Sequence, residues 1–178
     1  RQMCIRDRVN TRRIGGATDY SCSKYTSVIE EYCKKSEVGI NDIDYAIRYT
    51  LQNESFDFGF LGASEADENF SKGRDFYSFR VRKNFKDLTL GYLGTKTDRP
   101  ILLRKADVHS SDFTYLPNDK TRIDTIYAFS DVSQNNLSNK KGEIFRFKYV
   151  NSPSQKTYYD IFINFFDEAS DPVSYTHL

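Results

Sequence analysis

Apolar and polar residues alternate one by one along much of this chain, and no other feature constrains its fold as strongly. The run RDFYSFRVRKNFKDLTLGYLGTKTDRPILLR, residues 74–104, holds two such segments joined by a short polar link. In the first segment Tyr77, Phe79 and Val81 alternate with polar residues, and the second segment begins at Leu88. Alternation with a period of two is typical of a strand with one apolar and one polar face. The run therefore predicts an antiparallel hairpin.

The same hairpin unit recurs along the chain, so we expect an all-β fold of about eight strands in an antiparallel up-and-down meander. Each strand should have roughly 8–11 residues, close to the ~9–11 that cross a bilayer at a tilt. The alternating residues that identify these strands lie at positions 43–51, 56–61, 77–82, 88–95, 108–116, 121–131, 145–149 and 159–165.

Short and long links alternate between these strands. Tight turns are expected at Asn53, Asn84, Pro117 and Asn151. The longer links are expected at residues 65–73, 98–107 and 132–141, with residues 17–41 at the same end. In a meander, this places all tight turns at one end and all long loops at the other. A bacterial outer-membrane barrel has this arrangement, so we expect the chain to be part of a transmembrane β-barrel.

The two sides of the predicted strands differ in chemistry. Side chains expected to face lipid are aromatic or aliphatic: Tyr45, Tyr49, Phe56, Phe58, Phe60, Tyr77, Phe79, Leu90, Tyr92, Tyr127, Phe129, Phe145, Phe147, Tyr159, Ile161 and Ile163. Side chains expected to face the lumen are charged: Arg48, Asp57, Arg80, Arg82, Asp124, Arg146, Lys148 and Asp160. We expect the four basic residues from Arg80 onward to create a positive field, partly offset by the aspartates.

A soluble fold is the alternative, because a secreted β-sandwich also alternates apolar and polar residues and turns its charges to solvent. The chain combines 13 tyrosines and 14 phenylalanines with no tryptophan. A net charge of +1 argues against nucleic acid as a partner.

Gly91 and Gly94, beside Tyr92, predict a bend or a place where a large neighbour lies over the strand.

Both termini resemble translated sequencing adapter: MCIRDR at residues 3–8 and VSYTHL at residues 173–178. We therefore expect residues 1–8 and 172–178 to be artefacts, and residues 9–171 to be a partial β-barrel domain. Cys22 and Cys33 would suit a disulfide in an oxidising compartment, and two free thiols are the alternative.

No catalytic residue, metal site or cofactor is predicted. His109, Ser110, Ser111 and Asp112 are the residue types of a hydrolase triad, but neighbours on a strand point to opposite faces. The acidic stretch with Glu65, Asp67 and Glu68 lacks the glycine-punctuated spacing of a calcium loop.

Four runs resemble the barrel portion of the family catalogued as domain of unknown function 5916. They are RRIGG at residues 12–16, GRDFYSFRVRKNF at 73–85, GYLGTKTDRPILLRKADVHSSDFTY at 91–115 and SDVSQN at 130–135. The resemblance implies a Gram-negative outer-membrane protein in contact with membrane lipid. It also implies an N-terminal domain similar to a family 9 carbohydrate-binding module, which this chain lacks. Residues 17–41 do not match.

The resemblance carries no known chemistry, so the expected role stays broad. It is passage of a small polar solute, or surface binding linked to carbohydrate through the missing domain. An alternative is a surface or secreted glycan-acting hydrolase whose catalytic and binding parts lie outside this segment.

Overall fold

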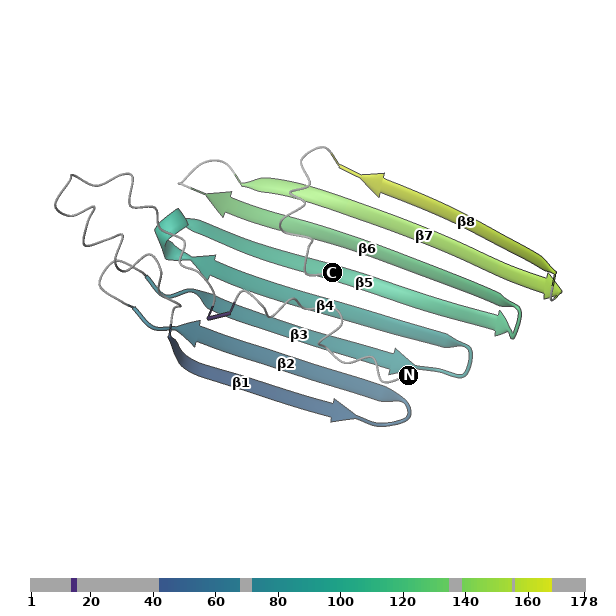
Figure 1. Ribbon diagram of the computed structural model, residues 1–178, viewed down its shortest axis with the longest axis horizontal. Coiled ribbons are helices and arrows are strands. Elements are labelled where there is room, and N and C mark those ends of the chain that lie inside the picture. The colour runs from purple at the N-terminus through teal and green to yellow at the C-terminus, as the bar shows by residue number, and fades with distance from the viewer. Residues whose placement is uncertain (1–13, 16–41, 68–71, 135–138, 155, 168–178) are drawn as a thin grey trace.

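The structure is a computed structural model that describes residues 14–15, 42–67, 72–134, 139–154 and 156–167. It confirms an all-β fold in which eight antiparallel strands form one up-and-down meander, each strand bonded to the next in chain order (Figure 1). The strands are β1 (Ile43–Gln52), β2 (Phe56–Glu65), β3 (Asp75–Asn84), β4 (Leu88–Arg99), β5 (Arg104–Asn118), β6 (Thr121–Gln134), β7 (Lys140–Ser154) and β8 (Thr157–Phe166).

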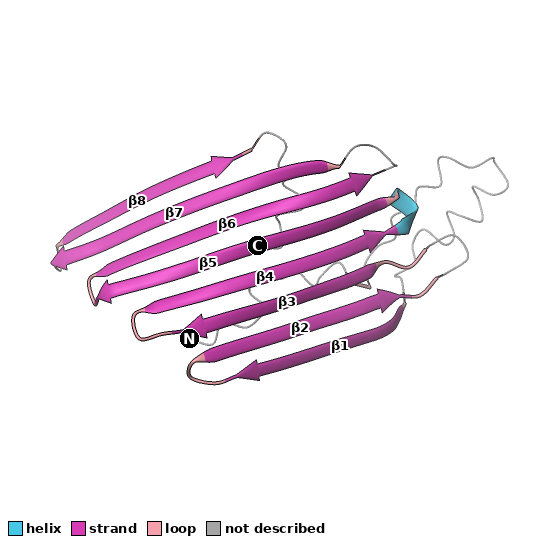
Figure 2. Cartoon of the chain, turned by 180° about the vertical axis from the view of Figure 1, so that it is seen from behind, coloured by secondary structure: helices cyan, strands magenta, loops and turns pink. Residues whose placement is uncertain are grey.

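The eight strands form a single layer, with β1 and β8 at its two margins (Figure 2). Helical structure in the described ranges is limited to one 3-10 turn, η4 (Pro100–Leu102), between β4 and β5. Among the described residues, no helix is long and apolar enough to span a membrane.

The long connection predicted at residues 98–107 is wrong, because β4 and β5 remain paired almost as far as the short turn that joins them. Arg99 still pairs with Arg104. Pro100 lacks an N–H for the ladder and begins the 3-10 turn. Leu103, the residue that caps the turn, has a φ of 46°. Charged residues on both strands hid this extension from an argument based on apolar alternation.

Two more strands also extend further than predicted at this end. β6 runs to Gln134 and β7 begins at Lys140, so the loop expected at 132–141 is shorter. Glu65 was assigned to an acidic loop but is the last residue of β2. As a result, the central strands reach 14 or 15 residues instead of 8–11.

The tight turns lie together at one end of the sheet and the other connections at the opposite end, as predicted (Figure 1). Two turns are shorter than predicted, because Pro117 lies within β5 and Asn151 lies within β7. The turn between β1 and β2 is closed by Asn53, whose Oδ1 accepts the N–H groups of Ser55 at 3.0 Å and Phe56 at 2.7 Å. This is an Asx turn, which explains the choice of asparagine. Asn118 Oδ1 likewise accepts the N–H of Lys120 at 3.0 Å.

Successive strands are staggered along their length, which Figure 1 shows as a slanted line of turns. Directly paired residues form rows across the sheet. The row that starts at Gln52, the turn end of β1, reaches β8 at Asn164. Asn164 lies seven residues from Thr157, which is the turn end of β8. The stagger is therefore roughly one residue per strand. With ~3.4 Å per residue and ~4.8 Å between strands, it corresponds to a strand tilt of about 35°.

The most buried side chains are small and gather on one face, toward the loop end. The apolar ones are Ala63, Leu93, Val108, Ala128 and Val132, and the polar ones include Ser78, Ser110 and Ser130. By the register, all eight alternate with the large aromatic side chains of the same strands. The sheet therefore buries small residues on one face and exposes large ones on the other.

Candidate functional site: an aromatic face and a charged face

One face of the sheet, called the aromatic face here, carries all sixteen side chains expected to face lipid. The register settles this, because directly paired residues share a face: Tyr49 pairs with Phe60, and Phe60 with Phe79. Many of these side chains are exposed, among them Tyr127 at 41% and Ile163 at 52%. Within the described ranges, no second sheet covers them.

Rings on neighbouring strands are in contact across the centre of the aromatic face. Phe79 and Tyr92 have ring centroids 5.6 Å apart, and His109 stacks on Phe129 at 4.9 Å. Tyr92 Oη lies 2.6 Å from His109 Nδ1. The ring of Phe79 lies over Gly94, where an added Cβ would be only 2.5 Å from Phe79 Cε1. The prediction that a large neighbour covers Gly94 is confirmed.

Charged residues border the aromatic face at its loop end. They lie at similar distances from the tight turns in five consecutive strands: Asp75, Lys96, Asp107, Asp131 and Glu143. Two ion pairs run along this border, Lys105 to Asp98 at 2.9 Å and Lys96 to Asp107 at 3.9 Å. The apolar surface is therefore a band of limited height.

The opposite face, called the charged face here, carries all eight residues expected to face a lumen. Seven of them, together with Asp112 and Arg122, form a belt that extends from the tight turns to the middle of the sheet. The charged belt consists of Asp57, Arg80, Arg82, Asp112, Arg122, Asp124, Arg146, Lys148 and Asp160. Arg48 lies outside the belt, level with Ser78, and is exposed.

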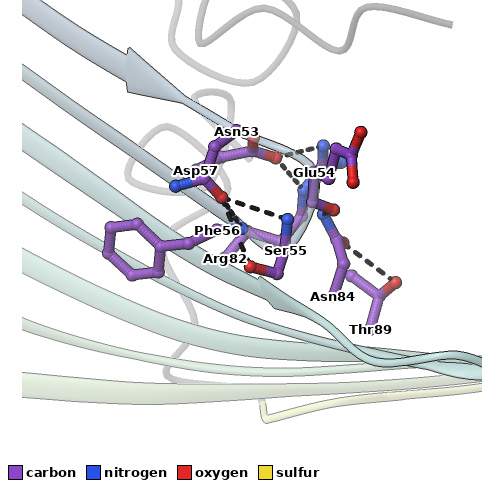
Figure 3. A network of polar contacts seen from close by, with 8 residues as sticks. All are labelled: Asn53, Glu54, Ser55, Phe56, Asp57, Arg82, Asn84 and Thr89. Atoms are coloured by element: carbon purple, nitrogen blue, oxygen red, sulfur yellow. Dashed lines mark hydrogen bonds and ion pairs between the residues drawn. The ribbon is translucent and has the colours of Figure 1, made fainter.

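The first ion pair of the belt joins neighbouring strands. Arg82 Nε donates to Asp57 Oδ2 at 2.7 Å, and the two residues are direct partners in the register of β2 and β3 (Figure 3). In the next row toward the turns, Thr89 Oγ1 donates to Asn84 Oδ1 at 3.2 Å. The turn and the ion pair thus form one polar network at this end of the sheet.

A second ion pair crosses a whole strand. Arg80 on β3 reaches Asp112 on β5 at 2.5 Å and passes over Gly91 of β4. A Cβ at Gly91 would lie 2.6 Å from both Arg80 Nη2 and Asp112 Oδ1. This confirms that a large neighbour covers Gly91. Asp112 was missed as a belt residue, although its place between Ser111 and Phe113 puts it on the charged face.

The remaining acids of the belt also have basic partners. Asp124 accepts two bonds from Arg122, at 2.6 and 2.9 Å, and one from Thr114 at 2.7 Å. Lys148 lies 3.6 Å from Asp160. Since the belt has five basic and four acidic members, most of the positive field expected from the basic residues is neutralised.

Arg146 completes the belt and has a different environment. Its Nε donates to Asn164 Oδ1 at 3.3 Å, and its Cζ lies 5.7 Å from the ring centroid of Phe162. Phe162 is 54% exposed, and the Arg146 side chain is also exposed. Neither partner carries a charge, so Arg146 keeps its positive charge uncompensated by any contact with the described residues.

A buried ion pair lies at the loop end of β2. Arg74 donates to Glu65 through Nε at 2.6 Å and Nη2 at 2.8 Å, and the two side chains are 6% and 0% exposed. The N–H of Gly15 also donates to Glu65 Oε1 at 2.8 Å. In the loop that follows, hydrogen bonds from Lys72 and from the N–H of Gly73 lower the pKa of the Asp67 carboxyl.

The four consecutive residues of the triad type are divided between the faces. His109 and Ser111 pair with residues of the aromatic face, whereas Ser110 and Asp112 lie on the charged face. The described residues contain no group of three or more acidic, histidine or cysteine side chains suited to hold a metal ion. Cys22, Cys33, Glu68 and the suspected adapter segments lie outside the described residues.

Comparison with known proteins adds no relative to this geometry. No protein-family model matches the chain, and neither the curated proteins nor the solved structures give a significant match. Any proposal about function therefore stands on the two faces themselves.

Proposed function

We propose that this chain is part of an outer-membrane β-barrel, with the aromatic face in lipid and the charged face toward an aqueous interior that passes a small polar solute. The observation that carries the proposal is the exposed aromatic face, which ends at a level border of charged residues. An exposed apolar surface that extends over eight strands is usually buried against a partner or a membrane. Membrane lipid matches this surface because the surface forms a band of limited height.

The height of the aromatic face supports this cover. On β6 the polar residues that bound it, Thr121 and Asp131, are ten residues apart. That separation corresponds to about 34 Å along a strand, or about 28 Å along the barrel axis at a tilt of about 35°. The outward apolar band of outer-membrane barrels is ≈ 25 Å tall. Their strands tilt by ≈ 35–45°, and the tilt of about 35° derived from the stagger lies at the lower end of that range.

The charged face supports an aqueous interior. Its belt holds nine charged side chains within the strands, which lipid would exclude and water or hydrogen-bonded partners would accept. A wall of paired charges with a small positive excess favours polar solutes over apolar ones.

The test uses the absence of tryptophan from the chain. Ile163 and Phe162 are adjacent on β8, lie on opposite faces and are 52% and 54% exposed. We expect Ile163→Trp to be quenched by lipids brominated in their acyl chains, because lipid covers its face. Phe162→Trp is the matched control and should be quenched by aqueous iodide instead.

Tryptophan fluorescence of the two full-length variants in brominated and ordinary vesicles would decide the question. If Ile163→Trp is insensitive to brominated lipid, the aromatic face is covered by protein, as in a soluble β-sandwich, and the proposal is wrong.

A further inference from the structure

The charged belt has one cation more than it has anions. Its four aspartates each lie within ion-pair distance of a different base, namely Arg82, Arg80, Arg122 and Lys148. Arg146 is the fifth base. Arg146 pairs directly with Ile126 on β6 and with Asn164 on β8. Neither of these partners supplies a carboxylate.

The guanidinium of Arg146 is held in place without being neutralised. Nε is engaged by Asn164 at 3.3 Å, and the ring of Phe162 lies beneath the group, 5.7 Å from Cζ. Arg146 makes no further hydrogen bond to the described part of the chain. Its two terminal nitrogens therefore keep N–H groups that no described residue accepts, on an exposed side chain.

We propose that Arg146, Phe162 and Asn164 form a binding site for the carboxylate of a small organic acid. The proposal rests on the function proposed above, since it needs the charged face to meet water. A guanidinium offers two parallel N–H bonds to the two oxygens of a carboxylate, with more specificity than an ammonium. An aromatic ring beneath the cation fixes its plane and stabilises its charge.

This site narrows the proposed class of solute from polar molecules to anionic ones. Lys148 lies two residues along β7 on the same face and adds positive potential, although Asp160 offsets part of it at 3.6 Å. The paired arginines of the belt cannot take this role, because a carboxylate of the chain already occupies each of them.

Phe162→Trp gives a direct reporter of this site, because tryptophan keeps an aromatic platform and is the sole tryptophan of the chain. Titration of the full-length variant in vesicles with succinate should give a saturable change in fluorescence, and neutral succinamide should give none. Arg146→Gln, introduced into the Phe162→Trp variant, should weaken the apparent affinity for succinate about tenfold or more, since the charged bidentate contact is lost. Arg146→Lys should weaken it less.

Arg48→Gln is the matched control, because Arg48 is an exposed arginine on the same face without an ion pair in the described structure. It should leave succinate binding unchanged, and circular dichroism should report the same strand content in every variant. An equal response with and without Arg146, or no response at all, would overturn the proposed site. Lipid quenching of Ile163→Trp is measured separately, so failure of the site and failure of the membrane assignment are distinguishable.

Discussion

Two glycines of β4 show how single residues organise this sheet. Gly91 lies beneath the Arg80–Asp112 ion pair on the charged face, and Gly94 lies beneath Phe79 on the aromatic face. In each case the missing Cβ leaves room for a side chain from β3 to lie over β4. Glycine weakens a strand interior in most sheets, but Gly91 permits an ion pair between β3 and β5, which are not neighbours in the sheet.

Replacing Gly91 by alanine should therefore destabilise the protein, although alanine is normally the better strand residue. The new Cβ would displace Arg80 and Asp112, whose side chains are only 11% and 9% exposed. We expect a loss of about 2 kcal/mol in the free energy of unfolding, typical of a disturbed, mostly buried charged hydrogen bond. Urea unfolding would measure it.

The control for this prediction is the same substitution in an Arg80→Ala, Asp112→Ala background. There the alanine should be nearly neutral, because no ion pair remains to be displaced. An equal loss in both backgrounds would contradict the role assigned to Gly91.

At the scale of elements, the loop ends of the hairpins use ion pairs of two kinds. Glu65 and Arg74 close the β2–β3 hairpin with a pair that is almost fully buried. Lys96 and Asp107 close β4 and β5 with a pair that is 58% and 41% exposed and 3.9 Å long. Removing one partner of a buried ion pair strongly destabilises the folded protein, whereas an exposed ion pair contributes little to the free energy of unfolding.

The two pairs give a matched comparison. Glu65→Ala should lower the free energy of unfolding by about 3–5 kcal/mol, because Arg74 then loses a buried carboxylate. Lys96→Ala should lower it by less than about 1 kcal/mol. Chemical denaturation of both variants in the same detergent measures the difference, and similar losses in the two would show that burial of the Glu65 pair is unimportant.

At the scale of the whole molecule, the proposed barrel places the two faces of one sheet in different surroundings. Ile47 and Ala46 are neighbours on β1, both exposed, on the aromatic and charged faces respectively. In water, lysine at either position would be a surface residue with little effect. In a bilayer, only the aromatic face would place that charge in hydrocarbon.

Ile47→Lys should therefore destabilise the protein in lipid vesicles by about 2–4 kcal/mol, the effect of a lysine at the midplane of an outer-membrane barrel. Ala46→Lys should change the stability by less than about 1 kcal/mol. Unfolding in urea from vesicles would report both values. Small and equal effects would argue for a soluble fold.

Local sequence was sufficient to predict the meander, the turn end and the division of side chains between the faces. Each of these depends on the period of two in a strand or on turn residues such as Asn53, which act over a few positions. The strand ends near Arg99 and Arg104 were missed because charged residues pair there without apolar alternation.

The three-dimensional arrangement of the strands determines which charged side chains form ion pairs. The pairing of Arg80 with Asp112 depends on the register of three strands and on Gly91 between them. Likewise, Glu65 became a buried partner of Arg74 only because β2 and β3 align at their loop ends. Alternation along one strand determines the face on which a side chain lies, but the side chain that it contacts depends on the alignment of strands distant in sequence.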